Sequence, residues 1–154
     1  MARILLLDHI APEGIALLEA ADDIEHEIHT GLAGEELRLA LAECDGAICR
    51  SGVTIADDQL SGNRQLKAIV RAGVGTDNID KAAATRAGIV VMNTPAGNTF
   101  STAEHTFTLM LAMSRNVAPA YQGLLDGSWD RASHMGVQLA NKTLGIVGLG
   151  RIGQ

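Results

Sequence analysis

Along the first 97 residues, short runs of apolar residues alternate with amphipathic stretches. Apolar runs bounded by turn residues predict buried strands, and amphipathic stretches between them predict surface helices. The predicted strands are Arg3–Asp8, Ile24–His29, Gly46–Cys49, Lys67–Arg71 and Ile89–Asn93. The predicted helices are Pro12–Ala21, Gly34–Ala42, at most one turn at Asp57–Leu60, and Asp80–Ala87.

This alternation is typical of an α/β protein in which helices connect the strands of a parallel sheet. Glycine-rich turns follow the predicted strands, so we expect a flavodoxin-like parallel sheet over residues 1–97. Within Ile24–His29 apolar and polar residues alternate, which indicates a half-exposed strand at the edge of that sheet.

The cluster Thr94-Pro95-Ala96-Gly97-Asn98 breaks the pattern and predicts a domain boundary, giving a first domain over 1–98 and a second part over 99–154. Beyond it, Ser101 or Thr102 is expected to cap a long helix that runs to about Arg115. We expect Pro119 to interrupt or restart this helix, which then continues to about Leu125. Two further segments follow, an exposed polar arm and a strand: Asp126–Asn141 and Thr143–Val147.

Composition narrows the class of protein. Of 154 residues 47% are apolar and 19% charged, and no apolar run is long enough for a membrane helix, so we expect a cytoplasmic globular protein. Residues 1–98 hold 15 acidic and 8 basic side chains, which argues against nucleic acid or an anionic membrane as a partner. An anionic ligand would therefore need local arginines and backbone amides.

The two cysteines, Cys44 and Cys49, stand alone as C-x4-C without a second pair, so we expect reduced, partly buried thiols and no metal site. The five histidines show no partner for nucleophilic or acid–base catalysis, and we assign none a catalytic role. We expect Asp8 to cap the helix after it, and Asp77 and Asp80 to cap the helix that begins near residue 80.

An arginine stands at the end of one predicted strand or directly after another, and a glycine follows it two residues later. Arg50 precedes Ser51-Gly52, and Arg71 precedes Ala72-Gly73-Val74-Gly75. If the strands are parallel neighbours, both arginines leave the same edge of the sheet, where open α/β sheets bind ligands. Two guanidinium groups above a glycine turn suit a phosphate or a carboxylate. The alternative is a tight turn that needs its glycines for backbone geometry alone.

The chain ends in a glycine motif. The apolar run before Gly148, Gly150 and Gly153 gives G-x-G-x-x-G, the turn that brings backbone amides to a dinucleotide pyrophosphate. The helix and the acidic residue that complete such a unit would lie beyond Gln154, so we expect this chain to be part of a longer protein.

Taken in order, these motifs resemble the D-2-hydroxyacid dehydrogenase family, and most closely its phosphoglycerate dehydrogenase branch. The matching segments are Arg50-Ser51, Arg71 to Asp80, Val91 to Pro95, Gly97-Asn98, Ala103-Glu104-His105 and Gly148 to Gly153. The resemblance implies a flavodoxin-like substrate domain followed by the start of a Rossmann domain that binds NAD, with the crossing near Asn98. It implies oxidation of 3-phospho-D-glycerate to 3-phosphooxypyruvate, the first step of L-serine biosynthesis, by a homodimer or homotetramer.

The resemblance also implies the roles of single residues. Amides around Gly73–Gly75 would hold the substrate carboxylate, with Val74 close to the nicotinamide. Arginines matching Arg50 and Arg71, and Arg131 from the neighbouring subunit, would face the phosphate. The implied substrate-binding set is Arg50, Ser51, Arg71, Gly73, Val74, Gly75, Asn98 and Arg131, and the implied NAD-binding set is Val74, Gly148, Gly150, Arg151, Ile152 and Gly153.

The family's catalytic histidine, glutamate and orienting arginine would all lie beyond Gln154, so we expect no turnover by this chain alone. Two other functions stay open. One is a different D-2-hydroxyacid dehydrogenase, such as a glyoxylate or hydroxypyruvate reductase, and the other is a non-catalytic module that binds NAD or another ligand. The choice between NAD and NADP depends on a ribose-contacting residue that would follow the glycine motif.

Overall fold

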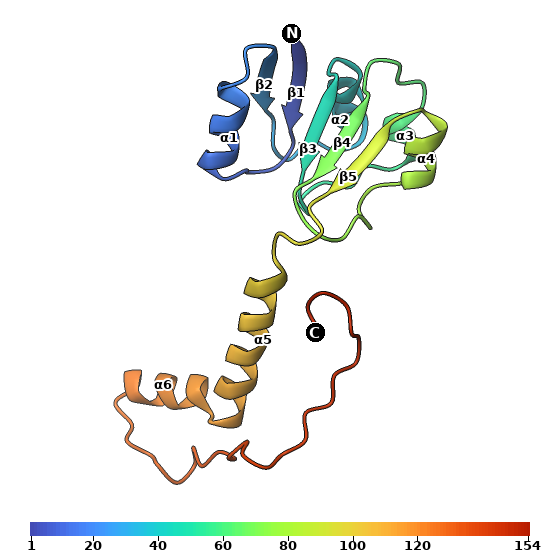
Figure 1. Cartoon of the computed structure of the whole chain (residues 1–154). Coiled ribbons are helices and arrows are strands. Elements are labelled where there is room, and N and C mark those ends of the chain that lie inside the picture. Colours follow the sequence, from blue (N-terminus) through green and yellow to red (C-terminus); the bar gives the residue numbers. More distant parts are fainter. The chain divides into compact units, whose positions relative to one another are not determined.

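The structure is a computed structural model that describes all 154 residues, and they divide into two units. The first unit comprises Met1–Gly97 and the second Asn98–Gln154 (Figure 1). None of the helices is both long and apolar enough to cross a membrane.

The first unit contains a five-stranded parallel sheet in the order β2-β1-β3-β4-β5. Its strands are β1 (Ala2–Leu6), β2 (Ile24–Ile28), β3 (Gly46–Cys49), β4 (Ala68–Arg71) and β5 (Val90–Asn93). This is the flavodoxin-like strand order, so the predicted fold class is confirmed for this unit. The alternating segment forms β2 and lies at the edge of the sheet, also as predicted.

Four helices connect the strands: α1 (Pro12–Glu19), α2 (Gly34–Ala42), α3 (Asp57–Leu60) and α4 (Lys81–Arg86). Pro12 begins α1, where its fixed φ suits a first helical position. Asp80 caps α4 by accepting a hydrogen bond from the Ala83 amide, as predicted. The prediction for Asp8 was wrong. Ala11 precedes α1 without any side-chain cap, and Asp8 accepts a hydrogen bond from another loop instead.

The core lies between the sheet and helices α2 to α4. Leu37 and Leu41 of α2 are fully buried, and Ile69 of β4 reaches the same cluster from the sheet. In β1 and just after it, Leu5, Leu6 and Leu7 are all buried, because a central parallel strand has both of its faces covered. Cys44 and Cys49 are free thiols, as expected, but both are fully rather than partly buried.

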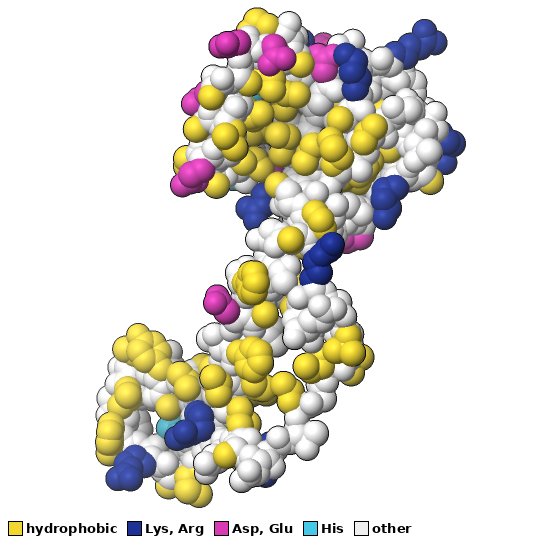
Figure 2. All heavy atoms as spheres, in the orientation of Figure 1, with side chains coloured by type: hydrophobic (Ala, Val, Ile, Leu, Met, Phe, Trp, Pro, Cys, Tyr) yellow, Lys and Arg dark blue, Asp and Glu magenta, His cyan; other side chains and the backbone are white.

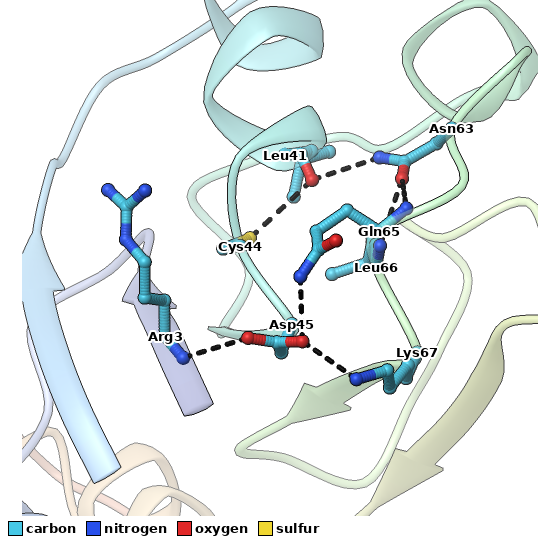
Figure 3. Close-up of polar contacts among 8 residues, drawn as sticks. All are labelled: Arg3, Leu41, Cys44, Asp45, Asn63, Gln65, Leu66 and Lys67. Carbon is cyan, nitrogen blue, oxygen red and sulfur yellow. Dashed lines mark hydrogen bonds and ion pairs between the residues drawn. The ribbon is translucent and has the colours of Figure 1, made fainter. Parts of the chain in front are cut away.

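At the amino ends of the strands, Asp45 joins three of them (Figure 3). Its carboxylate accepts hydrogen bonds from the Arg3 amide at 3.0 Å and from Gln65 Nε2 and Lys67 Nζ, both at 2.8 Å. Its own backbone donates to the Arg3 carbonyl and accepts from the Lys67 amide. The hydrogen bond from Lys67 holds the pKa of Asp45 below its ordinary value, with the Arg3 amide adding to the effect.

The second unit begins with α5 (Thr99–Ser114) and α6 (Val117–Leu125). Helix α5 begins earlier than predicted, so Ser101 and Thr102 lie inside it, and Ser101 Oγ donates to the Asn98 carbonyl. The two helices separate at Asn116, whose φ of 52° is left-handed, while Pro119 lies in the first turn of α6. An asparagine tolerates this conformation better than most residues and therefore ends the first helix.

Residues 126–154 contain neither helix nor strand. The prediction of a strand at Thr143–Val147 was wrong, because the second unit has no other strand to which this apolar run could hydrogen-bond. No side chain of the second unit is buried, and large apolar side chains cover much of its surface (Figure 2). Phe100, Met113, Trp129 and Val147 are among the most exposed.

Because no core protects the second unit, its backbone amides should exchange with solvent faster than those of the sheet. In the 154-residue chain we expect α5 and α6 to exchange within the range of local opening, while β1, β3 and β4 exchange only by global unfolding. Hydrogen–deuterium exchange measured by mass spectrometry checks this. Equal protection of the two units would contradict it.

The depressed pKa of Asp45 also predicts a pH effect. A carboxyl whose pKa is lower in the folded state adds stability above its unfolded pKa of about 3.9, and this contribution disappears as the pH falls through the folded pKa. Asp45→Asn should therefore be less stable than the wild type near neutral pH, and the difference should shrink below about pH 4. Urea unfolding at both pH values measures it, and a difference that stays constant with pH would contradict the ion-pair explanation.

Candidate functional site

The parallel register of β3 and β4 brings two loops to the carboxyl edge of the sheet. Cys49 lies opposite Arg71, and the Ala72 amide donates to the Cys49 carbonyl at 2.8 Å. The loop after β3 begins with Arg50, and the loop after β4 begins with Ala72. Arg50 and Arg71 therefore leave adjacent strands at the same edge, where ligands bind in open α/β sheets.

The guanidinium of Arg71 lies over the glycine turn that follows it. A Cβ atom built on Gly73 would collide with this guanidinium, and one built on Gly75 would lie 3.8 Å from Arg71 Nη1. Arg71 Nε is buried and has no hydrogen-bond partner. No carboxylate of the first unit forms an ion pair with Arg50 or Arg71.

The turn after Arg71 is fixed through its carbonyl groups. The Thr94 amide donates to the Gly73 carbonyl at 3.1 Å, and Asn93 Nδ2 donates to the Val74 carbonyl at 2.7 Å. The Gly73 amide is already used, since it donates to the Arg71 carbonyl at 2.8 Å. The amides of Val74 and Gly75 donate to no group of the first unit, which leaves them for an anion.

The loop after β3 is held by two residues from elsewhere in the chain. Asp8 Oδ2 accepts a hydrogen bond from the Arg50 amide at 2.6 Å. Asn78 Nδ2 donates to the carbonyls of Arg50 and Val53 at 2.9 and 2.8 Å. A Cβ atom on Gly52 would collide with the Asp8 carboxylate, so this position requires a glycine while Asp8 stays in place.

The sequence did not indicate these roles of Asp8 and Asn78. Asp8 follows β1, which is the parallel neighbour of β3, so the position of Arg50 after β3 was a signal that could have led to it. Cys49, the last residue of β3, is buried, and its pKa is raised to about 11, chiefly by burial and also by the charge of Asp8, while Arg71 and Asn78 act in the opposite direction.

The remaining predicted site residues lie in other surroundings. Ser51 is exposed in the loop after Arg50, and Asn98 immediately precedes α5. Arg131 borders a cavity of about 300 Å³ in the second unit, together with Trp129, His134 and Leu124. No group of three or more His, Cys, Asp or Glu side chains is placed to hold a metal ion.

The terminal glycine motif forms a turn without a preceding strand or a following helix. Gly148 has a φ of +108°, which only glycine adopts readily, and a Cβ atom on Gly153 would collide with the Gly148 carbonyl. The Gly153 and Gln154 amides donate to the Gly150 carbonyl. The amides from Gly148 to Arg151 donate to no group of the second unit, and Arg151 and Ile152 are exposed beside them.

Comparison with known proteins places this geometry in context. A family model described as the catalytic domain of D-isomer specific 2-hydroxyacid dehydrogenases matches residues 4–142. The D-3-phosphoglycerate dehydrogenase of Methanocaldococcus jannaschii is 44% identical over 154 residues, which is 100% of this chain and 29% of that relative.

Solved structures of similar proteins show the same fold. The TT0316 protein of Thermus thermophilus aligns with a TM-score of 0.87 at 32% identity, over 98% of this chain and 50% of that one. The NAD+-bound 3-phosphoglycerate dehydrogenase of Entamoeba histolytica aligns with a TM-score of 0.77 at 30% identity, over 99% of this chain and 48% of that one. This chain therefore spans less than a third of the curated relative and about half of each solved chain.

The close approach of Arg71 to Gly73 can be tested by substitution. Gly73 does not have a positive φ, so Gly73→Ala should change the free energy of unfolding by no more than about 1 kcal/mol. The added methyl group should displace the guanidinium and expose Arg71 Nε, whose proton would then exchange faster in an NMR measurement. Gly145→Ala, at a position with no atom within 4 Å, is the control and should leave this proton unchanged. An unchanged Nε proton in Gly73→Ala would contradict the described geometry.

Proposed function

Because the chain belongs to the D-isomer specific 2-hydroxyacid dehydrogenase family, we propose that it supplies the substrate-binding part of an NAD-dependent enzyme that oxidises 3-phospho-D-glycerate to 3-phosphooxypyruvate. The observation that carries this proposal is the pair of arginines without an ion-pair partner in the first unit, Arg50 and Arg71, at the ends of adjacent strands beside a glycine turn. Oxidation of this hydroxy acid is the reaction we assign to the first step of L-serine biosynthesis.

The two anionic groups of this substrate have separate binding partners in the proposal. Arg50 and Arg71 bind the phosphate, because a guanidinium forms paired, charge-assisted hydrogen bonds with phosphate oxygens. The unused amides of Val74 and Gly75 bind the carboxylate, as successive backbone N–H groups do in anion-binding turns. Gly73 contributes by leaving room for the guanidinium rather than through its amide. Ser51, exposed in the loop after Arg50, is also proposed to contact the substrate, and the proposed role of Asn98 rests on the family alone.

The cofactor-binding part of the proposal rests on the terminal glycine turn and on Val74. The unused amides from Gly148 to Arg151 and the positive charge of Arg151 fit a pyrophosphate, while Ile152 and Gly153 complete the turn. When bound, NAD accepts the hydride that leaves the substrate carbon. Val74 lies next to the carboxylate-binding amides and would contact the nicotinamide.

We further propose that the 154 residues alone do not turn over substrate. A hydroxy acid needs a general base for its hydroxyl proton, and no histidine side chain of this chain hydrogen-bonds to a residue of the sheet-edge site. The complete enzyme is proposed to be a homodimer or homotetramer, in which the exposed apolar side chains of the second unit contact a neighbouring subunit. Arg131 would then reach the phosphate of that neighbour.

Binding of 3-phospho-D-glycerate to the 154-residue chain, measured by NMR titration or calorimetry, tests the phosphate assignment. Arg50→Ala and Arg71→Ala should each weaken binding on the order of tenfold or more, since a hydrogen bond to a charged group contributes about 1.5–3 kcal/mol. Together they should remove the preference for 3-phospho-D-glycerate over D-glycerate. Arg64→Ala removes an equal charge from an exposed position of the same unit and is the control.

An unchanged preference for the phosphorylated ligand in the double variant would contradict the phosphate assignment. Tighter binding of D-glycerate or glyoxylate by the wild type would favour a different D-2-hydroxyacid dehydrogenase.

A further inference from the structure

One residue connects the two arginine-bearing loops. Asn78 belongs to the connection between β4 and α4. All three of its hydrogen bonds go to the connection between β3 and α3. Its side-chain Nδ2 donates to the carbonyls of Arg50 and Val53, and its own carbonyl accepts from the Ile55 amide at 2.8 Å. Arg50 and Val53 lie 28 and 25 residues before Asn78 in the chain.

These contacts fix both ends of the segment Arg50–Val53. Asp8 holds the amide of Arg50, Asn78 holds the carbonyl of the same residue, and the buried Val53 side chain anchors the other end. Between these points Ser51 and Gly52 are exposed and make no hydrogen bond with the rest of the unit. The amide group of Asn78 therefore contributes, together with Asp8 and Val53, to the backbone course of this loop and to the direction in which Arg50 leaves it.

The placement of Arg71 depends on the other connection, the one between β4 and α4, to which Asn78 belongs. Arg71 precedes the turn at Gly73, whose carbonyl accepts from the Thr94 amide, and Asn78 lies later in that connection, two residues before the α4 cap Asp80. Any shift of Asn78 relative to the β3 loop would thus change the separation of the two guanidinium groups. A ligand bound by both arginines at once requires that separation to be maintained.

We propose that Asn78 is a positioning residue that sets the placement of Arg50 relative to Arg71 for binding of the substrate phosphate. This inference rests on the proposed function, because it assumes that both arginines bind one anion. Asn78 itself need not touch the ligand. Its two N–H groups already have carbonyl partners, and its side-chain Oδ1 is buried without a partner.

The chain contains a matched control. Asn63 is also half-buried, and its side chain also joins segments that are distant in sequence, donating to the Leu41 carbonyl and accepting from the amides of Gln65 and Leu66. It lies near the amino end of β4, at the opposite edge of the sheet from the arginines. Asn63→Ala therefore removes a comparable set of hydrogen bonds from a place where no anion site is proposed.

The experiment compares Asn78→Ala, Asn78→Ser and Asn63→Ala in the 154-residue chain, with 3-phospho-D-glycerate as the probe. Asn78→Ala should weaken its binding about tenfold, and Asn78→Ser, whose hydroxyl can donate to only one carbonyl, should have an intermediate effect. Asn63→Ala should change binding less than about twofold even where urea unfolding shows an equal loss of stability. In NMR, the Arg50 amide, which donates to Asp8, should exchange faster in Asn78→Ala only.

The outcomes separate the two hypotheses. If the wild type binds 3-phospho-D-glycerate and Asn78→Ala binds it equally well, the positioning role is overturned while the proposed function stands. If the wild type does not bind it, the proposed function fails, and the exchange rate of the Arg50 amide decides separately whether Asn78 orders the loop. If Asn78→Ala does not fold, the graded comparison rests on Asn78→Ser, for which an effect equal to that of Asn63→Ala overturns the proposal.

Discussion

The parallel pairing of β3 with β4 is the constraint on which the candidate site depends. Each residue from Gly46 to Cys49 pairs in register with one from Ala68 to Arg71, so both strands end at the same level. A displacement by one residue would turn the side chains of one strand to the other face of the sheet and remove Ile69 from the core. Because burial of the core fixes this register, it also fixes the positions of Arg50 and Arg71 at the carboxyl edge of the sheet.

The sequence predicted the first unit well where the pattern is local. Gly46–Cys49, Gly34–Ala42 and the single turn at Asp57–Leu60 match the structure, because apolar or amphipathic runs there end at glycine or at polar residues. Asp80 was also recognised, since a helix cap acts over only three residues.

The unpredicted features depend on contacts that are distant in the chain. Asp8 binds a backbone amide 42 residues away, and Asn78 binds carbonyls up to 28 residues away, so neither leaves a periodic signal. The strand expected at Thr143–Val147 failed for the opposite reason. Its apolar pattern is suitable, but a strand forms only beside another strand, and the second unit offers none.

The second unit illustrates how far helix formation differs from core formation. Helices α5 and α6 satisfy their backbone hydrogen bonds internally, yet none of their side chains is buried. Their apolar residues, such as Phe107 and Leu111, have surfaces that become favourable only when another surface covers them. In the first unit, by contrast, Leu37 and Leu41 find their partners within the same 97 residues.

The Asp45 cluster at the amino edge has a consequence for how such a protein can change over evolutionary time. It joins β1, β3 and β4 at the ends of the strands opposite to the arginines. Mutations that alter ligand preference can accumulate in the loops after β3 and β4 without loosening the hydrogen bonds that join the strands at Asp45. Such a protein can therefore diverge in these loops while the join between the strands at Asp45 is retained.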